Sequence, residues 1–123
     1  VFAAGVSIVG VADWQMEMEL DDGQPLAFRT SLRSPYEDLA FASSANSQLE
    51  RWRAPILFVN GDDDHSGWLR QAIQLGQSLR QRGVEVESWV EPGGTHGGVS
   101  QRHVLERVRR VIEFFDRRLE NGK

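Results

Sequence analysis

Short apolar segments that suit buried strands alternate along this chain with longer segments that suit amphipathic helices. The strand-like segments are residues 2–11, 56–59 and 84–90, and the helical segments are residues 34–49, 69–79 and 104–119. Parallel neighbouring strands need a crossover connection, which is usually a helix. The alternation therefore predicts an α/β fold of about three mostly parallel strands with flanking helices.

The first half of the chain gives two clear patterns and one unclear one. Residues 2–11 form a continuous small and apolar run, which predicts a strand buried on both faces. Residues 13–33 show no clean period and predict irregular structure. Ser34 as the capping residue and Pro35 in the first turn then predict one helix that runs to about Leu49.

The second half shows amphipathic patterns in every segment. One helical face gathers Leu69, Ala72, Ile73, Gly76 and Leu79, and the last helix carries an apolar stripe of Val104, Val108, Val111, Ile112, Phe115 and Leu119. Gly83 is placed where a helix cap belongs. Valines alternate with glutamates over residues 84–91, which predicts a half-exposed strand at a sheet edge. The arginines between Arg102 and Arg118 are mixed with acids and predict a solvated helix face rather than a binding patch.

Composition excludes several classes of protein. A chain of 123 residues is one domain at most, and a net charge of -4 argues against nucleic acid as a partner. The absence of cysteine excludes disulfides, thiolate metal sites and cysteine nucleophiles, and it fits a cytoplasmic and a periplasmic protein alike. No apolar run approaches the roughly 18 residues of a membrane span, so we expect no membrane partner.

Asp64 is the first candidate for chemistry. Residues 55–64 run from an apolar strand pattern through Gly61 into an acidic turn that ends on Asp64. A catalytic acid that orients a histidine needs such a place at the end of a strand. A solvated acidic turn is one alternative. A calcium loop is another, because Asp62, Asp64, Ser66 and Gly67 match four EF-hand positions, but Ile73 stands where the bidentate Glu belongs.

His96 is the second candidate. It lies in Pro92-Gly93-Gly94-Thr95-His96-Gly97-Gly98, between the third strand-like segment and the last helix. The glycines allow the backbone to approach a partner closely and leave the imidazole in an open site. His65 and His103 lack this setting, and the three histidines do not have the spacing of a zinc site. The sequence thus predicts an Asp64–His96 acid–base pair and no metal ion.

No nucleophile accompanies the pair. The elbow motif Gly-x-Ser-x-Gly occurs nowhere in the chain. The segment Gly5 to Gly10 around Ser7 is one residue too long and lies within a strand. Ser66 and Ser100 also lack the elbow context.

Five segments in this order resemble the C-terminal end of the prolyl oligopeptidase family of serine peptidases, to which dipeptidyl and acylaminoacyl peptidases belong. The segments are Phe2–Trp14, Ser34-Pro35, Ala54–Asp64, Glu91–Gly97 and Val111–Leu119. The resemblance implies the C-terminal half of an α/β-hydrolase fold, with a peptide as substrate of the intact enzyme and no cofactor. It also implies Asp64 as the triad acid, His96 as the general base, and Trp14 and Val11 in the substrate pocket. The family usually has Val where this chain has Gly67, followed by Trp68.

The start of the chain leads to two expectations. Val1 is not a methionine and opens within an apolar segment, so we expect residues 1–123 to be a partial hydrolase domain, truncated at the N-terminus and without activity of its own. A half-sheet would expose an edge or a face, which favours a homo-oligomer. Two alternative functions remain open: a non-catalytic α/β interaction module, and another α/β-hydrolase such as an esterase.

Overall fold

A computed structural model describes residues 2–16, 35–66, 68–96 and 101–119 of the protein. Besides a helical turn at residues 14–16, the elements in chain order are β1 (Gly5–Ile8), α2 (Pro35–Ala42), the 3₁₀ helix η2 (Ala45–Arg51), β2 (Ile56–Gly61), α3 (Trp68–Gln81), β3 (Val86–Glu91) and α4 (Gln101–Leu119). Strands and helices therefore alternate through the second half, as the sequence pattern predicts.

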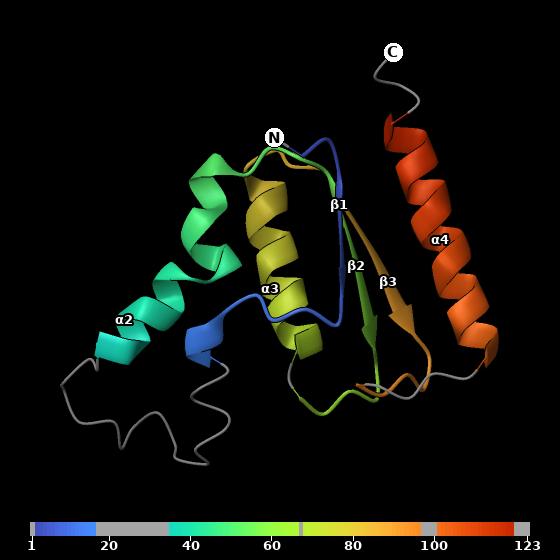
Figure 1. Cartoon of the computed structure of the whole chain (residues 1–123), viewed down its shortest axis with the longest axis horizontal. Coiled ribbons are helices and arrows are strands. Elements are labelled where there is room, and N and C mark those ends of the chain that lie inside the picture. The colour runs from blue at the N-terminus through green and yellow to red at the C-terminus, as the bar shows by residue number, and fades with distance from the viewer. Residues whose placement is uncertain (1, 17–34, 67, 97–100, 120–123) are drawn as a thin grey trace.

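The three strands form one parallel sheet in the order β1-β2-β3. Gly5 lies beside Ile56 in the first pairing, and Ile56 lies beside Val86 in the second. Figure 1 shows α3 on one face of the sheet, with α2 beyond it, and α4 on the opposite face. The predicted α/β class, with parallel strands and flanking helices, is confirmed.

The central strand β2 supplies both halves of the core, because its six residues are all buried. Ile56 and Phe58 face α3 and pack in a cluster with Ala12, Ala72, Leu75, Leu79 and Val84. Leu57 and Val59 face α4 and pack against Phe114. The alternation of side chains along one buried strand thus fixes a helix to each face.

Helix α3 ends as the sequence predicts. Gly83 adopts a φ of +78°, and its N–H donates to the carbonyl of Arg80 while the N–H of Val84 donates to the carbonyl of Leu79. These two bonds are the Schellman arrangement, which favours glycine at the left-handed position. The predicted helix face is wrong at Ile73, which is 49% exposed, whereas Gln71 is 1% exposed.

The predictions for the first half need correction. The strand β1 is shorter than the predicted 2–11, and none of its residues is buried. Among the described residues β1 has a neighbour on one side only, and Val9 ends it with a φ of 49°, which a β-branched residue rarely adopts. The capping position Ser34 and nearly all of the segment 13–33, from residue 17 onward, lie outside the described residues.

The single helix predicted over 34–49 is also wrong. It divides into α2 and η2, with Ser44 between them in an extended conformation (φ -88°, ψ 152°). The Ser44 hydroxyl donates to the carbonyl of Ala40 at 2.7 Å and accepts the N–H of Trp14 at 2.8 Å. A serine that binds backbone groups in this way competes with continued helix.

The last two elements, β3 and α4, also differ from their patterns, and ion pairs join them. Glu91, on the predicted exposed face of this half-exposed strand, is 1% exposed, whereas Val90, on the other face, is 40% exposed. The Arg118 guanidinium binds the carboxylates of Glu85 and Glu87. The arginine face of α4 is therefore not simply solvated. Its predicted apolar stripe is largely exposed at Val104, Val108, Ile112 and Leu119.

Candidate active site

Two loops meet at the carboxyl edge of the sheet. Asp64 follows β2 and His96 follows β3, and these parallel strands end side by side, with Gly61 opposite Glu91. Figure 1 shows both loops at the same end of the molecule, below the arrowheads of the strands. Carboxyl ends of parallel strands are where open α/β sheets bind their ligands.

Backbone contact between two glycines joins the loops. A Cβ on Gly61 would overlap the carbonyl oxygen of Gly94, and a Cβ on Gly94 would lie 3.0 Å from the Cα of Gly61. The N–H of Asp63 donates to that same Gly94 carbonyl at 3.0 Å. The carboxylate of Asp62 accepts the N–H of Gly93 at 2.6 Å, and Gly93 adopts a φ of +66°. Side chains at Gly61 or Gly94 would push the two loops apart.

The contact places Asp64 and His96 next to each other. Nδ1 of His96 lies 3.3 Å from Oδ2 of Asp64. The Asp64 side chain is 0% exposed, whereas the His96 side chain is 51% exposed. One member of the pair is thus fixed inside the protein, and the other reaches solvent with part of its ring.

Asp64 is held as a carboxylate. Burial by itself would raise the pKa of Asp64, but hydrogen bonds from the Ser66 hydroxyl, the Ser66 N–H and His96 outweigh burial and lower that pKa below its ordinary 3.8. The Ser66 N–H lies 3.0 Å from Oδ1. An ionised carboxylate accepts hydrogen bonds and cannot donate one. The arrangement can therefore orient an imidazole and stabilise its protonated form.

An ion pair between the buried Glu91 and the partly buried Arg107 lies at the start of the His96 loop. The Arg107 guanidinium on α4 binds Glu91 through two bonds, Nε to Oε1 at 2.8 Å and Nη2 to Oε2 at 2.6 Å. The hydrogen bonds to Glu91 raise the pKa of Arg107. Glu91 is the last residue of β3, so the pair joins the start of the His96 loop to α4. Sequence reasoning missed it, because Glu91 continued a Val–Glu alternation.

Val11 and Trp14 follow β1 at the same edge of the sheet. Val11 is half-buried and Trp14 is 48% exposed. Oε1 of the buried Gln71 accepts the N–H groups of Ala12 at 3.0 Å and Asp13 at 2.9 Å, which fixes this segment to α3. Among the described residues, neither Val11 nor Trp14 makes a hydrogen bond or ring contact with Asp64 or His96.

Metal binding has no support in the described ranges. Within them, no three histidine or acidic side chains converge as a metal ion would need. The carboxylates of Asp62 and Asp64, which matched a calcium loop, bind Gly93 and His96 of the loop after β3. Nor is any described helix both long and apolar enough to cross a lipid bilayer.

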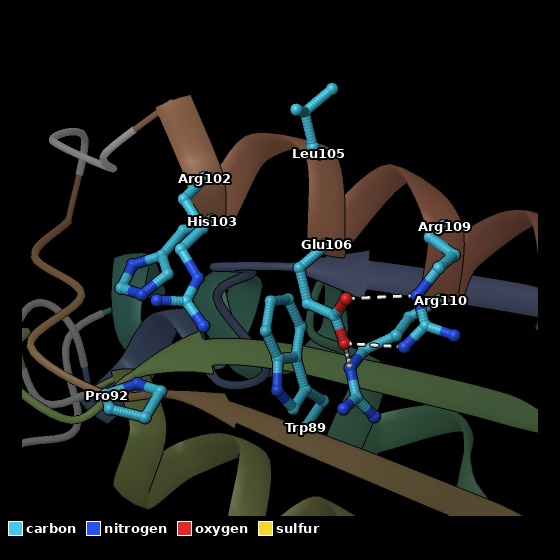
Figure 2. A pocket seen from close by; sticks show the side chains of 8 residues that line it. All are labelled: Trp89, Pro92, Arg102, His103, Leu105, Glu106, Arg109 and Arg110. Carbon is cyan, nitrogen blue, oxygen red and sulfur yellow. Dashed lines mark hydrogen bonds and ion pairs between the residues drawn. The ribbon is translucent and has the colours of Figure 1, made fainter.

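A separate open groove of about 790 Å³ lies between β3 and the first half of α4, and neither Asp64 nor His96 lines it. Figure 2 shows Glu106 bound by Arg109 and Arg110 beside Trp89. The bond from Arg109 is the main cause that lowers the pKa of Glu106 to about 2. Glu106, the one acid that lines this groove, is therefore held by two of its arginines.

Residues 1–122 match the model of the prolyl oligopeptidase family. The chain belongs to the prolyl oligopeptidase family. This is a family of serine peptidases with an α/β-hydrolase catalytic domain, and the resemblance found in the sequence is confirmed.

Solved structures of other family members are similar to the chain. Acylaminoacyl peptidase of Pyrococcus horikoshii matches with a TM-score of 0.78 and 24% identity over 99% of the chain and 21% of its own length. An acylaminoacyl peptidase in complex with Z-Gly-Gly-Phe-chloromethyl ketone matches with a TM-score of 0.76 and 27% identity, over 96% and 20% of the two chains.

Dipeptidyl peptidase 4 of Porphyromonas gingivalis matches with a TM-score of 0.62 and 22% identity, over 89% of the chain and 16% of its own. Among curated proteins, none matches the sequence. The chain spans about a fifth of the length of the two acylaminoacyl peptidases.

The glycine contact gives a stability prediction. We expect Gly61→Ala to lower the free energy of unfolding by about 1–3 kcal/mol or more, because the new methyl group overlaps the Gly94 backbone. Gly5→Ala is the matched control, since a Cβ there meets nothing within 4 Å. Urea unfolding of both variants measures the difference. Equal and small effects would show that the loops do not touch as described.

The lowered pKa of Asp64 gives a pH prediction. The native state binds fewer protons at Asp64 than the unfolded state. The contribution of Asp64 to stability is therefore present above pH 3.8, the ordinary pKa of the group, and is lost as the pH falls through the lower native pKa. The stability difference between wild type and Asp64→Asn should therefore shrink from about pH 7 to about pH 3 or below. Asp63→Asn, at an exposed position, should give a small difference throughout. A difference for Asp64→Asn that stays constant on acidification would contradict the pairing.

Proposed function

We propose that this chain supplies the acid and the base of a serine peptidase. The observation that carries the proposal is the pairing of a buried carboxylate, Asp64, with a half-exposed imidazole, His96, at 3.3 Å. Membership of a serine peptidase family supports the proposal, because serine peptidases use such a pair to activate their nucleophile. The nucleophile of the proposed enzyme is a serine outside these 123 residues, which hold no Gly-x-Ser-x-Gly motif.

The roles follow from which nitrogen faces the carboxylate. With Nδ1 directed at Asp64, Nε2 is the nitrogen left to meet a reacting group. Nε2 of His96 would accept the proton of the serine hydroxyl as the serine attacks a peptide carbonyl. It would then pass this proton to the leaving amine. Asp64 would hold the ring in place and stabilise the imidazolium formed between the two transfers.

The burial of Asp64 supports this division of labour. A carboxylate shielded from water interacts more strongly with a transient imidazolium than an exposed one does. Its remaining hydrogen bonds, to Ser66, keep it ionised although it is buried. No cofactor takes part in these steps.

The substrate of the proposed enzyme is a short peptide. We assign Trp14, and with it Val11, to the pocket that receives the residue before the scissile bond. Both follow β1 at the carboxyl edge of the sheet, and Trp14 exposes a large apolar surface there. Gln71 and Ser44 bind backbone N–H groups of this segment, which gives Trp14 a stable position as one wall of the pocket.

The proposal predicts a selective loss of activity. In the longer parent protein, His96→Ala should lower kcat/KM for peptide substrates by at least about a thousandfold, because the group assigned to move the serine proton is lost. His65→Ala is the matched control, since His65 is next to Asp64 in sequence but its side chain is 90% exposed.

Two results would refute the proposal. One is a near-normal rate for His96→Ala in a parent that hydrolyses peptides. The other is turnover by the isolated 123-residue chain together with its labelling by a fluorophosphonate, because the nucleophile would then lie inside it. Absence of an elbow serine from the upstream gene sequence would favour a non-catalytic module instead.

A further inference from the structure

We propose that Ser66 is a positioning residue that fixes the tautomer of His96. This inference deepens the proposed function, since it concerns the same pair. The starting observation is that Oγ of Ser66 touches both partners. It donates to Oδ1 of Asp64 and lies 3.2 Å from Nδ1 of His96.

The direction of each bond follows from counting protons. A hydroxyl has one proton to donate, and the ionised Asp64 can only accept. Ser66 therefore directs its proton to Asp64 and turns a lone pair toward His96. Nδ1 of His96 then faces two acceptors, Oγ of Ser66 at 3.2 Å and Oδ2 of Asp64 at 3.3 Å.

Two acceptors around one nitrogen favour a proton on that nitrogen. An Nδ1–H group can share its hydrogen bond between both oxygens, as a three-centre bond. Each distance is longer than the usual 2.9–3.0 Å, so Asp64 alone would hold the ring loosely. Ser66 supplies the second acceptor. The unprotonated nitrogen is then Nε2, which is the form of imidazole that a general base requires.

The backbone and a neighbouring ring hold this arrangement in place. The Ser66 N–H donates to Oδ1 of Asp64 at 3.0 Å, which fixes the hydroxyl relative to the carboxylate. Trp68 packs edge-to-face on His96, with ring centroids 4.1 Å apart and an angle of 81° between the planes. A ring in contact with Trp68 on one side has less freedom to turn Nδ1 away from Ser66.

The test reads the tautomer directly in the 123-residue chain. Two-bond proton–nitrogen correlation spectra of histidine-labelled protein, recorded at a pH where His96 is neutral, distinguish Nδ1–H from Nε2–H. Wild type should be mainly Nδ1–H. Ser66→Ala should lower the ratio of Nδ1–H to Nε2–H about three- to tenfold, the range that one hydrogen bond supplies. Ser66→Thr, which keeps the hydroxyl, should restore the ratio. Ser43→Ala, at an exposed turn, should leave it unchanged.

The outcomes separate this inference from the proposed function. A wild-type His96 that is mainly Nε2–H, or a Ser66→Ala variant with an unchanged ratio and a folded circular dichroism spectrum, overturns the role of Ser66. Labelling of Ser66 itself by a fluorophosphonate also overturns it. The proposed function would stand in the first two cases if His96→Ala still abolishes turnover in the parent. A third outcome is that the spectra confirm the tautomer but the parent protein stays active as His96→Ala. That outcome would refute the proposed function and leave the positioning role of Ser66 intact.

Discussion

The close approach of two glycines, Gly61 and Gly94, is the constraint on which the candidate site depends. It brings the loop after β2 against the loop after β3 without any side chain between them. Two further bonds cross the same junction, from Asp63 N–H to the Gly94 carbonyl and from Gly93 N–H to Asp62. With the loops held in this way, Asp64 and His96 have little freedom to separate. Hydrogen bonds of the Asp64 carboxylate to Ser66 and His96 then complete the site.

Polar side chains that are largely buried also hold the segments around this junction in place. Glu91 and Arg107 form a two-bond ion pair between the base of the His96 loop and α4. Gln71 binds two backbone N–H groups of the segment that leads to Trp14. Such groups are costly to bury unless every partner is present. Near the carboxyl edge these groups fix the backbone of the segments that carry Trp14 and His96, as in pre-organised sites.

The sequence predicts the parts of the fold that depend on local pattern. The alternation of strands and helices, the buried strand β2 and the cap at Gly83 are all visible in it, because each reflects burial or backbone conformation at neighbouring positions. The candidate pair is visible for a related reason. Asp64 and His96 each follow a strand, and parallel strands bring their ends together.

The remaining features depend on partners distant in sequence. Glu91 looks exposed in a Val–Glu alternation until Arg107 covers it from α4. The division between α2 and η2 arises because Ser44 binds the N–H of Trp14, 30 residues away. Ser66 lacks an elbow context and so looked unimportant, although its hydroxyl touches both Asp64 and His96. No local pattern contains such contacts.

The central claim is that Asp64 accepts a hydrogen bond from Nδ1 of His96, and proton NMR tests it most directly. A far-downfield imidazole N–H resonance should be present in the wild-type chain. It should disappear in Asp64→Asn and His96→Gln and persist in His103→Gln. Such a signal requires an Nδ1–H that is sheltered from exchange by a carboxylate. A spectrum without this resonance, or one in which it survives Asp64→Asn, would contradict the account.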